Sequence, residues 1–255
     1  MHSRSTKLLA EFGGTFFVVL VAAGTAAIAP ITTDTSSPSL LQLTPLAAAL
    51  AYGAAYAFAV GSLGRVSGGH FNPAVTVAHW VTHRAGTIET ALYFLAQMAG
   101  ATAAAYALRT LLPASATSAV RLGPPVLASG VTRGPALLIE GAMTAALVLA
   151  LWVAIMGREK PRYWLGGIVA GIVVAAASYL GAPYTGGVMN PARAFGPALA
   201  WRLWGYQNVY WVGPLAGGVL AASLYDFFFR RKTVRPGVRP SVPSSPQAEA
   251  NKTLS

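Results

Sequence analysis

Two short segments carry the residue types most capable of chemistry, and they share one pattern. They are SGGHFNPAVT at residues 67–76 and TGGVMNPARA at residues 185–194, where paired glycines precede Asn-Pro-Ala. Asn suits the cap of a helix, and Pro suits the first helical position, where the missing N–H has no partner to lose. The pattern therefore predicts two helix starts, one at Asn72-Pro73-Ala74 and one at Asn190-Pro191-Ala192.

If the two predicted helix starts border a pore, their Asn side chains can donate hydrogen bonds to molecules inside it. If each Asn oxygen accepts a backbone N–H at its own cap, its amide protons remain free to donate. A water molecule held by two such donors turns both hydrogens away, so it cannot relay a proton, and converging helix N-termini repel cations. One Asn-Pro pair is most simply a helix cap in a loop, but two symmetrically placed copies favour a pore.

Composition indicates a membrane protein. The 255-residue chain is 55% hydrophobic and only 10% charged, against about 25% charged in soluble proteins. It contains no Cys, which excludes disulfides and cysteine metal sites. The formal net charge is +11, and the densest basic run, 230–235, directly follows a long apolar stretch. That position favours lipid headgroups over nucleic acid as the partner of the basic residues.

Six apolar stretches are long enough to cross a hydrocarbon core, which needs roughly 17 to 25 helical residues. They are 8–29, 46–63, 90–108, 135–156, 163–182 and 209–229. The first could be a secretory signal, but it is too long for one and contains Glu11, so we expect a retained span. Segments 71–80 and 189–201 cover roughly half of the core at about 1.5 Å per residue, so they are expected to be half-helices.

The chain repeats itself beyond the two Asn-Pro-Ala sites. LLAEFGGT at 8–15 resembles LLIEGAMT at 137–144, and YFLAQMAG at 93–100 resembles YWVGPLAGG at 210–218. Repeat 1 (about 8–110) and repeat 2 (about 131–230) each hold three spans and one half-helix. Because three is odd, the second copy enters the membrane in the opposite sense.

This topology predicts one channel domain and a tail. We expect a single transmembrane domain over 1–232 and a disordered cytoplasmic tail over 233–255, which is rich in Pro, Ser and charge. Most Lys and Arg residues fall in cytoplasmic loops if both termini are cytoplasmic. Loops 30–45 and 111–134 are then external.

Four charged or titratable residues are further candidates. Arg193 lies in the first turn of the second half-helix, where a cation opposes the helix dipole, so we interpret it as a pore residue rather than the partner of a carboxylate. Glu11 and Glu140 occupy equivalent places in the repeats and are expected to accept N–H groups of the loops before the half-helices. His70 is interpreted as a loop anchor, because no other ligand stands at metal-binding spacing and no metal site is expected.

With these motifs, the sequence resembles the major intrinsic protein family, the aquaporins and aquaglyceroporins, over about residues 8–230. The resemblance implies an all-α membrane protein with six transmembrane helices and two re-entrant half-helices, assembled as a homotetramer with one pore in each subunit. It also implies an external selectivity filter of Tyr52, Ser178, Gly187 and Arg193. Ala194 directly after NPAR is similar to the water-channel branch, whereas Ser178 replaces a bulky ring and predicts looser selectivity.

The expected function is passive conduction of water across the cell membrane, with protons and ions excluded. Small neutral solutes, namely hydrogen peroxide, ammonia, urea and glycerol, are candidate permeants. The alternatives are a secondary active transporter, which can also use inverted repeats, and a structural membrane protein with an occluded pore. Neither a nucleophile beside a base nor a metal constellation can be assembled, so catalysis and cofactors are not expected. No nucleic-acid partner is expected, because the basic residues form no stripe interleaved with aromatic residues.

Overall fold

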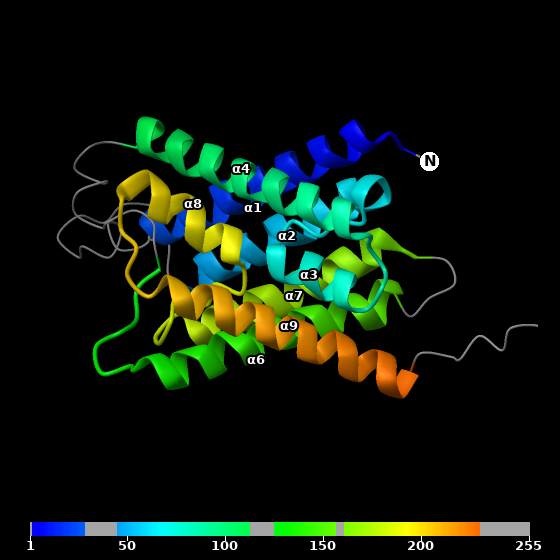
Figure 1. Ribbon diagram of the computed structural model, residues 1–255. Helices are drawn as coiled ribbons and strands as arrows, with labels where there is room; N and C mark the ends of the chain where they lie inside the picture. The colour runs from blue at the N-terminus through cyan, green and yellow to red at the C-terminus, as the bar shows by residue number, and fades with distance from the viewer. Residues whose placement is uncertain (1, 29–44, 113–124, 157–160, 230–255) are drawn as a thin grey trace, which may run out of the picture.

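The computed structural model describes residues 2–28, 45–112, 125–156 and 161–229, and these residues form helices without strands. The helices are α1 (Arg4–Ile28), α2 (Pro45–Ser67), α3 (Pro73–Val81), α4 (Thr87–Leu111), α6 (Arg133–Leu151), α7 (Tyr163–Gly181), α8 (Pro191–Trp201) and α9 (Gln207–Phe229). Figure 1 shows their arrangement. The all-α prediction is confirmed. The predicted tail, 233–255, and most of the predicted external loops lie outside the described residues.

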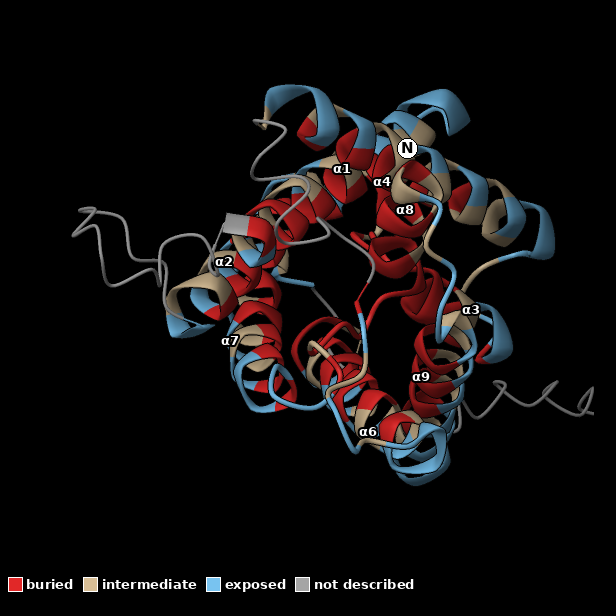
Figure 2. Cartoon of the chain, turned by 90° about the vertical axis from the view of Figure 1, so that its left-hand side faces the viewer, coloured by how far each residue is buried: buried red, intermediate tan, exposed pale blue. Residues whose placement is uncertain are grey.

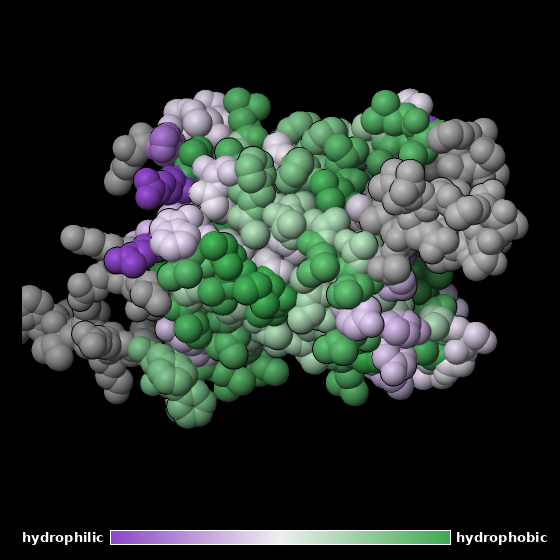
Figure 3. All heavy atoms as spheres, turned by 180° about the vertical axis from the view of Figure 1, so that it is seen from behind, coloured by the Kyte–Doolittle hydropathy of each residue, from purple (hydrophilic) through white to green (hydrophobic). Residues whose placement is uncertain are grey.

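Six of these helices are long and apolar enough to cross a membrane: α1, α2, α4, α6 with its extension, α7 and α9. Large apolar side chains point outward from them, including Leu138, which is 76% exposed, and Ile172, which is 64% exposed. Figure 3 shows one face of the molecule as predominantly hydrophobic, with most hydrophilic residues toward the two ends. An apolar surface of this extent is unfavourable in water and is matched by lipid, so the chain is a multi-pass membrane protein.

Several helices extend beyond the ends of the predicted spans. α1 begins at Arg4 rather than residue 8, and α2 continues to Ser67 rather than 63. A helix can continue beyond the hydrocarbon core into the headgroup region, where polar residues are tolerated, so hydropathy underestimates its length. α6 also ends differently, because its last turn is a π-helix over Trp152–Met156. No feature of the sequence indicated this change of winding.

The two short helices interlock the halves of the molecule. α3 has 9 residues and α8 has 11, so each is roughly 14 to 17 Å long and cannot cross the membrane. α3 packs against α9, and α8 packs against α4, so each half-helix lies beside the last span of the other repeat. Neither repeat can therefore complete its half of the site alone.

The contact between α2 and α7 depends on glycine. A Cβ atom on Gly53 would collide with the carbonyl oxygen of Gly171, and a Cβ atom on Gly171 would collide with that of Gly53. The reciprocal contact shows that the two backbones approach as closely as helices can. It fixes corresponding helices of the two repeats against each other.

Buried residues face the inside of a ring of helices in the end-on view of Figure 2. The buried polar side chains include most of the candidate residues: Glu11, His70, Asn72, Glu140, Ser178, Asn190 and Arg193. The N-terminal end of α1 and the C-terminal end of α9 lie at the same end of the molecule (Figure 1). This placement is what an even number of membrane crossings requires.

Candidate functional site

Asn72 and Asn190 cap the two half-helices, as the sequence predicts. The Asn72 side-chain oxygen accepts from the backbone N–H of Ala74 at 2.9 Å. The Asn190 oxygen accepts from Ala192 at 3.0 Å and, at 3.4 Å, from Arg193. These bonds satisfy N–H groups that a helix start otherwise leaves without partners.

The amide nitrogens of the same two residues join the repeats. Asn72 Nδ2 donates to the carbonyl oxygen of Met189 at 2.8 Å, and Asn190 Nδ2 donates to that of Phe71 at 2.9 Å. The expectation that all amide protons remain free is therefore wrong in part. Each amide uses one proton to bind the opposite loop, and its second proton remains able to donate.

Glu11, on α1, holds the loop before α3. Its carboxylate accepts from the backbone N–H groups of His70 at 3.1 Å and Phe71 at 2.8 Å. It also accepts from the Ser67 hydroxyl at 2.6 Å and from Gln97 Nε2 at 2.8 Å. Four donors surround a side chain with no exposed surface, which is how a buried carboxylate is stabilised.

Glu140, on α6, makes the corresponding bonds to the loop before α8. It accepts from the backbone N–H groups of Val188 at 3.0 Å and Met189 at 2.7 Å, and from the Thr185 hydroxyl at 2.7 Å. Met189 has φ +56°, a left-handed conformation that side chains rarely adopt. The glutamate thus binds the two successive backbone N–H groups that flank Val188 and fixes this loop conformation.

His70 contacts its own half-helix. Its Nδ1 atom lies 3.1 Å from the Thr76 hydroxyl, and its ring stacks on His79 with centroids 3.9 Å apart. Within the described residues, no group of three or more His, Cys, Asp or Glu side chains could hold a metal ion. The geometry is that of a packed loop side chain.

The four predicted filter residues come together as two contacting pairs. Arg193 is 5% exposed, and its Cζ atom lies 5.7 Å from the centroid of the Tyr52 ring, in cation–π contact. Gly187 has φ +59°, and a Cβ atom there would lie 2.6 Å from the Ser178 Cα atom. A side chain therefore cannot replace Gly187 without displacing α7.

The predicted filter residues offer several hydrogen-bond donors. The Nε and Nη1 atoms of Arg193 are buried and have no hydrogen-bond partner among the described residues. Ser178 offers a hydroxyl that can donate or accept. Together with the face of Tyr52, these groups can bind a small polar molecule through its acceptor atoms.

Tyrosine contacts with the two loops were missed by the sequence analysis. Four buried tyrosine hydroxyls donate to carbonyl oxygens in these loops or at the end of α2: Tyr93 to Ser67 at 2.8 Å, Tyr210 to Thr185 at 2.9 Å, Tyr56 to His70 at 3.1 Å and Tyr52 to Val188 at 3.0 Å. Tyr93 and Tyr210 open the repeated stretches at 93–100 and 210–218, so the repeat itself carried a signal for that pair.

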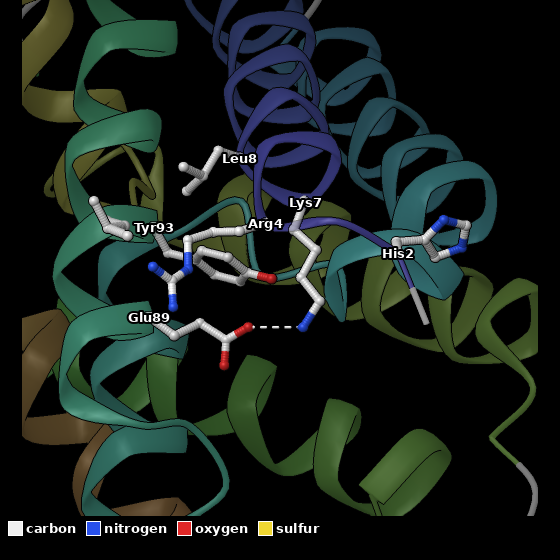
Figure 4. Close-up of a pocket in the computed structure, with 7 residues that line it drawn as sticks. His2, Arg4, Lys7, Leu8, Glu89 and Tyr93 are labelled. Atoms are coloured by element: carbon white, nitrogen blue, oxygen red, sulfur yellow. Dashed lines mark hydrogen bonds and ion pairs between the residues drawn. The ribbon is translucent and has the colours of Figure 1, made fainter.

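Two cavities lie near the first loop. One, of about 370 Å³, is lined by Ser67, His70 and His79 among others. The second, of about 260 Å³, lies at the start of α1, where Lys7 binds Glu89 at 2.9 Å (Figure 4). None of the residues predicted for the pore lines the second cavity. It shares Lys7, Glu89 and Tyr93 with the first cavity, which His70 also lines.

Known proteins resemble this chain in sequence and in fold. The chain matches the family described as major intrinsic protein over residues 2–225. It is 37% identical over 224 residues to aquaporin TIP4-4 of Zea mays, covering 87% of this chain and 86% of the relative. It is 34% identical over 242 residues to the lens fiber major intrinsic protein of Oryctolagus cuniculus, covering 92% and 88%.

A solved structure matches at the level of the fold. The aquaglyceroporin from Plasmodium falciparum aligns with a TM-score of 0.78 and 21% identity, covering 92% of this chain and 98% of that one. The prediction of an aquaporin-like architecture with re-entrant half-helices is confirmed by this match.

Proposed function

Because the chain belongs to the major intrinsic protein family, we propose that it is a passive membrane channel that conducts water and excludes protons and ions. The observation that carries this proposal is the pairing of Asn72 and Asn190, each of which caps a half-helix and bonds to the loop of the other. Members of this family are channels rather than enzymes.

The paired caps supply a mechanism for proton exclusion. Each Asn retains one amide proton, so a water oxygen between the caps can accept two hydrogen bonds. Its own hydrogens then point away along the lumen, and it cannot accept a proton from a neighbouring water. The N-terminal ends of α3 and α8 carry partial positive charge, which raises the energy of any cation at this point.

The filter residues support a channel that admits more than water. Ser178 has a small side chain and Gly187 has none, so we propose that Tyr52 and Arg193 alone limit the cross-section and leave space for a small neutral solute. We propose hydrogen peroxide, ammonia or urea as such a solute in preference to glycerol, which also needs an apolar wall for its carbon backbone. Glu11, Glu140 and His70 act as loop anchors that hold the filter residues and the Asn caps in position.

The assembly proposed is a homotetramer in the cell membrane, with one pore in each subunit and both termini cytoplasmic. The distribution of Lys and Arg between loops supports this orientation. Residues 1–232 form the channel domain and 233–255 a cytoplasmic tail. Chemical cross-linking in native membranes tests the assembly, and a band no larger than one chain contradicts it.

Purified protein in liposomes tests the function. Osmotic shrinkage should be faster than in empty liposomes, with a low activation energy and no proton current. Asn190→Ala should reduce water flux or admit protons, whereas Asn208→Ala, at an exposed Asn of α9, should do neither. Shrinkage no faster than in empty liposomes indicates an occluded pore, and saturable, gradient-driven uptake indicates a carrier; either result overturns the proposal.

A further inference from the structure

The cavity at the start of α1 has walls of two kinds (Figure 4). Basic and apolar side chains from α1 and its approach meet the first turns of α4, and the lining residues are His2, Arg4, Lys7, Leu8, Glu89, Leu92 and Tyr93. The volume of the cavity is about 260 Å³, whereas a single water molecule needs only roughly 15 Å³. A group as large as a phosphate therefore fits.

Positive charge exceeds negative charge in this cavity. Lys7 Nζ binds Glu89 Oε1 at 2.9 Å, so these two charges compensate each other. Arg4 is exposed, and within the described residues its guanidinium makes no hydrogen bond or ion pair. Both cations extend from α1 toward Glu89 on α4 (Figure 4). The cavity thus keeps one uncompensated positive charge, which attracts an anion.

The position of the cavity along α1 corresponds to the level of lipid headgroups. The apolar run of this helix begins at Leu8, directly after Lys7. Headgroup regions border the hydrocarbon core, and basic side chains meet lipid phosphates there. Leu8 and Leu92 line the same cavity, and Leu9, the next residue on α1, is 70% exposed. Basic and apolar walls in one cavity match a phospholipid, whereas a soluble anion uses only the basic wall.

We infer that this cavity binds an anionic phospholipid by its phosphate group. Arg4 and Lys7 bind the phosphate oxygens, because charge-assisted hydrogen bonds from basic side chains suit this group. Leu8 and Leu92 contact the apolar part of the lipid, which distinguishes it from free phosphate. A zwitterionic lipid carries a cation beside its phosphate, so it is a weaker ligand for a cavity with excess positive charge.

The cavity adjoins the contacts that hold the loop before α3. Tyr93, in the cavity wall, donates its hydroxyl to the carbonyl oxygen of Ser67 at 2.8 Å. The Ser67 hydroxyl donates in turn to Glu11 at 2.6 Å, and Glu11 binds the backbone of this loop. A ligand that binds the folded chain but not the unfolded chain raises the Tm. An anionic lipid in the cavity should therefore stabilise the junction of α1, α2 and α4.

Thermal unfolding of the full-length protein in detergent tests the ligand class. Added phosphatidylglycerol should raise the Tm by at least about 2 °C, and phosphatidylcholine or inorganic phosphate should raise it by less than half as much. An equal rise with phosphatidylcholine would show that the cavity does not recognise charge. An equal rise with inorganic phosphate would show that it binds the free anion. No rise with phosphatidylglycerol would exclude the site, and each of these three results overturns the inference.

Arg4→Gln tests the location of the site. The affinity for phosphatidylglycerol, measured by native mass spectrometry, should fall about fivefold, the effect of one basic residue near lipid phosphates. Arg162→Gln is the matched control, at an exposed residue outside the cavity, directly before α7. Alternate crossings place the start of α7 at the same end as the start of α1.

In Arg162→Gln the affinity should fall by less than about twofold, because salt screens charges that do not contact the lipid. Equal losses in the two variants would show that the overall charge of this end attracts the lipid, and an unchanged affinity in Arg4→Gln would show that the cavity does not bind it. Either result overturns the inference. Because binding is measured, neither result depends on whether the chain conducts water.

Discussion

Arg193 places a buried positive charge beside the Tyr52 ring. It lies in the first turn of α8, is 5% exposed and rests over the Tyr52 ring. The matching position in the first half-helix is Val75, so the pseudo-symmetry of the backbone is broken by this side chain. A cation that is both buried and opposed to the helix dipole is energetically unfavourable. We therefore propose that Arg193 occupies this position because of its role in the pore.

Arg193→Val should enlarge the mouth and remove its charge, making it like the equivalent position in repeat 1. We expect the permeability to a small neutral solute such as urea to rise by about tenfold, equivalent to about 1.4 kcal/mol, and proton leak to increase. Stopped-flow solute uptake and a pH-sensitive dye in liposomes measure the two effects. A correctly folded variant with the parental solute profile would show that Arg193 is structural and that the filter is wrongly assigned.

Ser178→His should narrow the filter opposite Tyr52. A ring at this position fills space that the serine leaves open, so passage of hydrogen peroxide should fall by about tenfold while water flux falls less. Ser178→Ala removes the hydroxyl without narrowing the pore and serves as the control, for which we expect a change of less than about twofold. Equal loss of solute and water in the histidine variant would contradict the proposed width.

At the scale of elements, each half-helix depends on a glutamate from another helix. Met189 adopts φ +56° and Phe71 adopts φ +48°, conformations that cost on the order of 1 to 3 kcal/mol each for residues with side chains. Glu140 and Glu11 bind the backbone N–H groups of these two residues and of the residue before each of them. The strained backbone brings the Asn caps together, so the glutamates have a structural basis for being buried inside spans.

Glu140→Gln should destabilise the protein. A glutamine has one acceptor oxygen, and its NH₂ group faces donors where the second carboxylate oxygen accepted from Met189. The loss of a charged hydrogen bond predicts about 2 kcal/mol of destabilisation and a Tm lower by roughly 4 to 8 °C, with reduced water flux. Thermal unfolding in detergent measures the shift.

Glu89→Gln makes the same chemical change at a partly exposed ion pair with Lys7. It should lower stability by no more than about 1 kcal/mol, the usual range for such pairs. Equal shifts in the two variants would show that Glu140 does not hold the loop before α8.

The elements were predicted to different degrees, for physical reasons. Long apolar runs identify spans, and Asn-Pro identifies the starts of α3 and α8, because both signals are local in sequence. The bonds from Asn72 to Met189 and from Asn190 to Phe71 join loops more than 100 residues apart, so they depend on how the repeats pack. The tyrosine–carbonyl contacts required the same knowledge, and the π-helical turn of α6 had no local signal at all.

At the scale of the whole molecule, interlocking repeats produce a site that neither repeat contains. α3 lies against α9 and α8 against α4, while α2 and α7 cross through glycine. One face of this bundle is predominantly hydrophobic (Figure 3), and the buried residues face the inside of the ring of helices (Figure 2). Each chain therefore has its own candidate pore, and no second copy is needed to complete the contacts that build it.

The composition of the chain also determines how it responds to mercury. Mercury(II) binds thiolates, and the 255 residues include no Cys. We therefore expect water flux in liposomes to be unchanged by mercuric chloride. Ser178→Cys, which places a thiol in the filter with little change in size, should introduce inhibition that a reducing thiol reverses. Reversible inhibition of the parent would mean that mercury acts elsewhere, and failure to inhibit the cysteine variant would place residue 178 outside the conducting path.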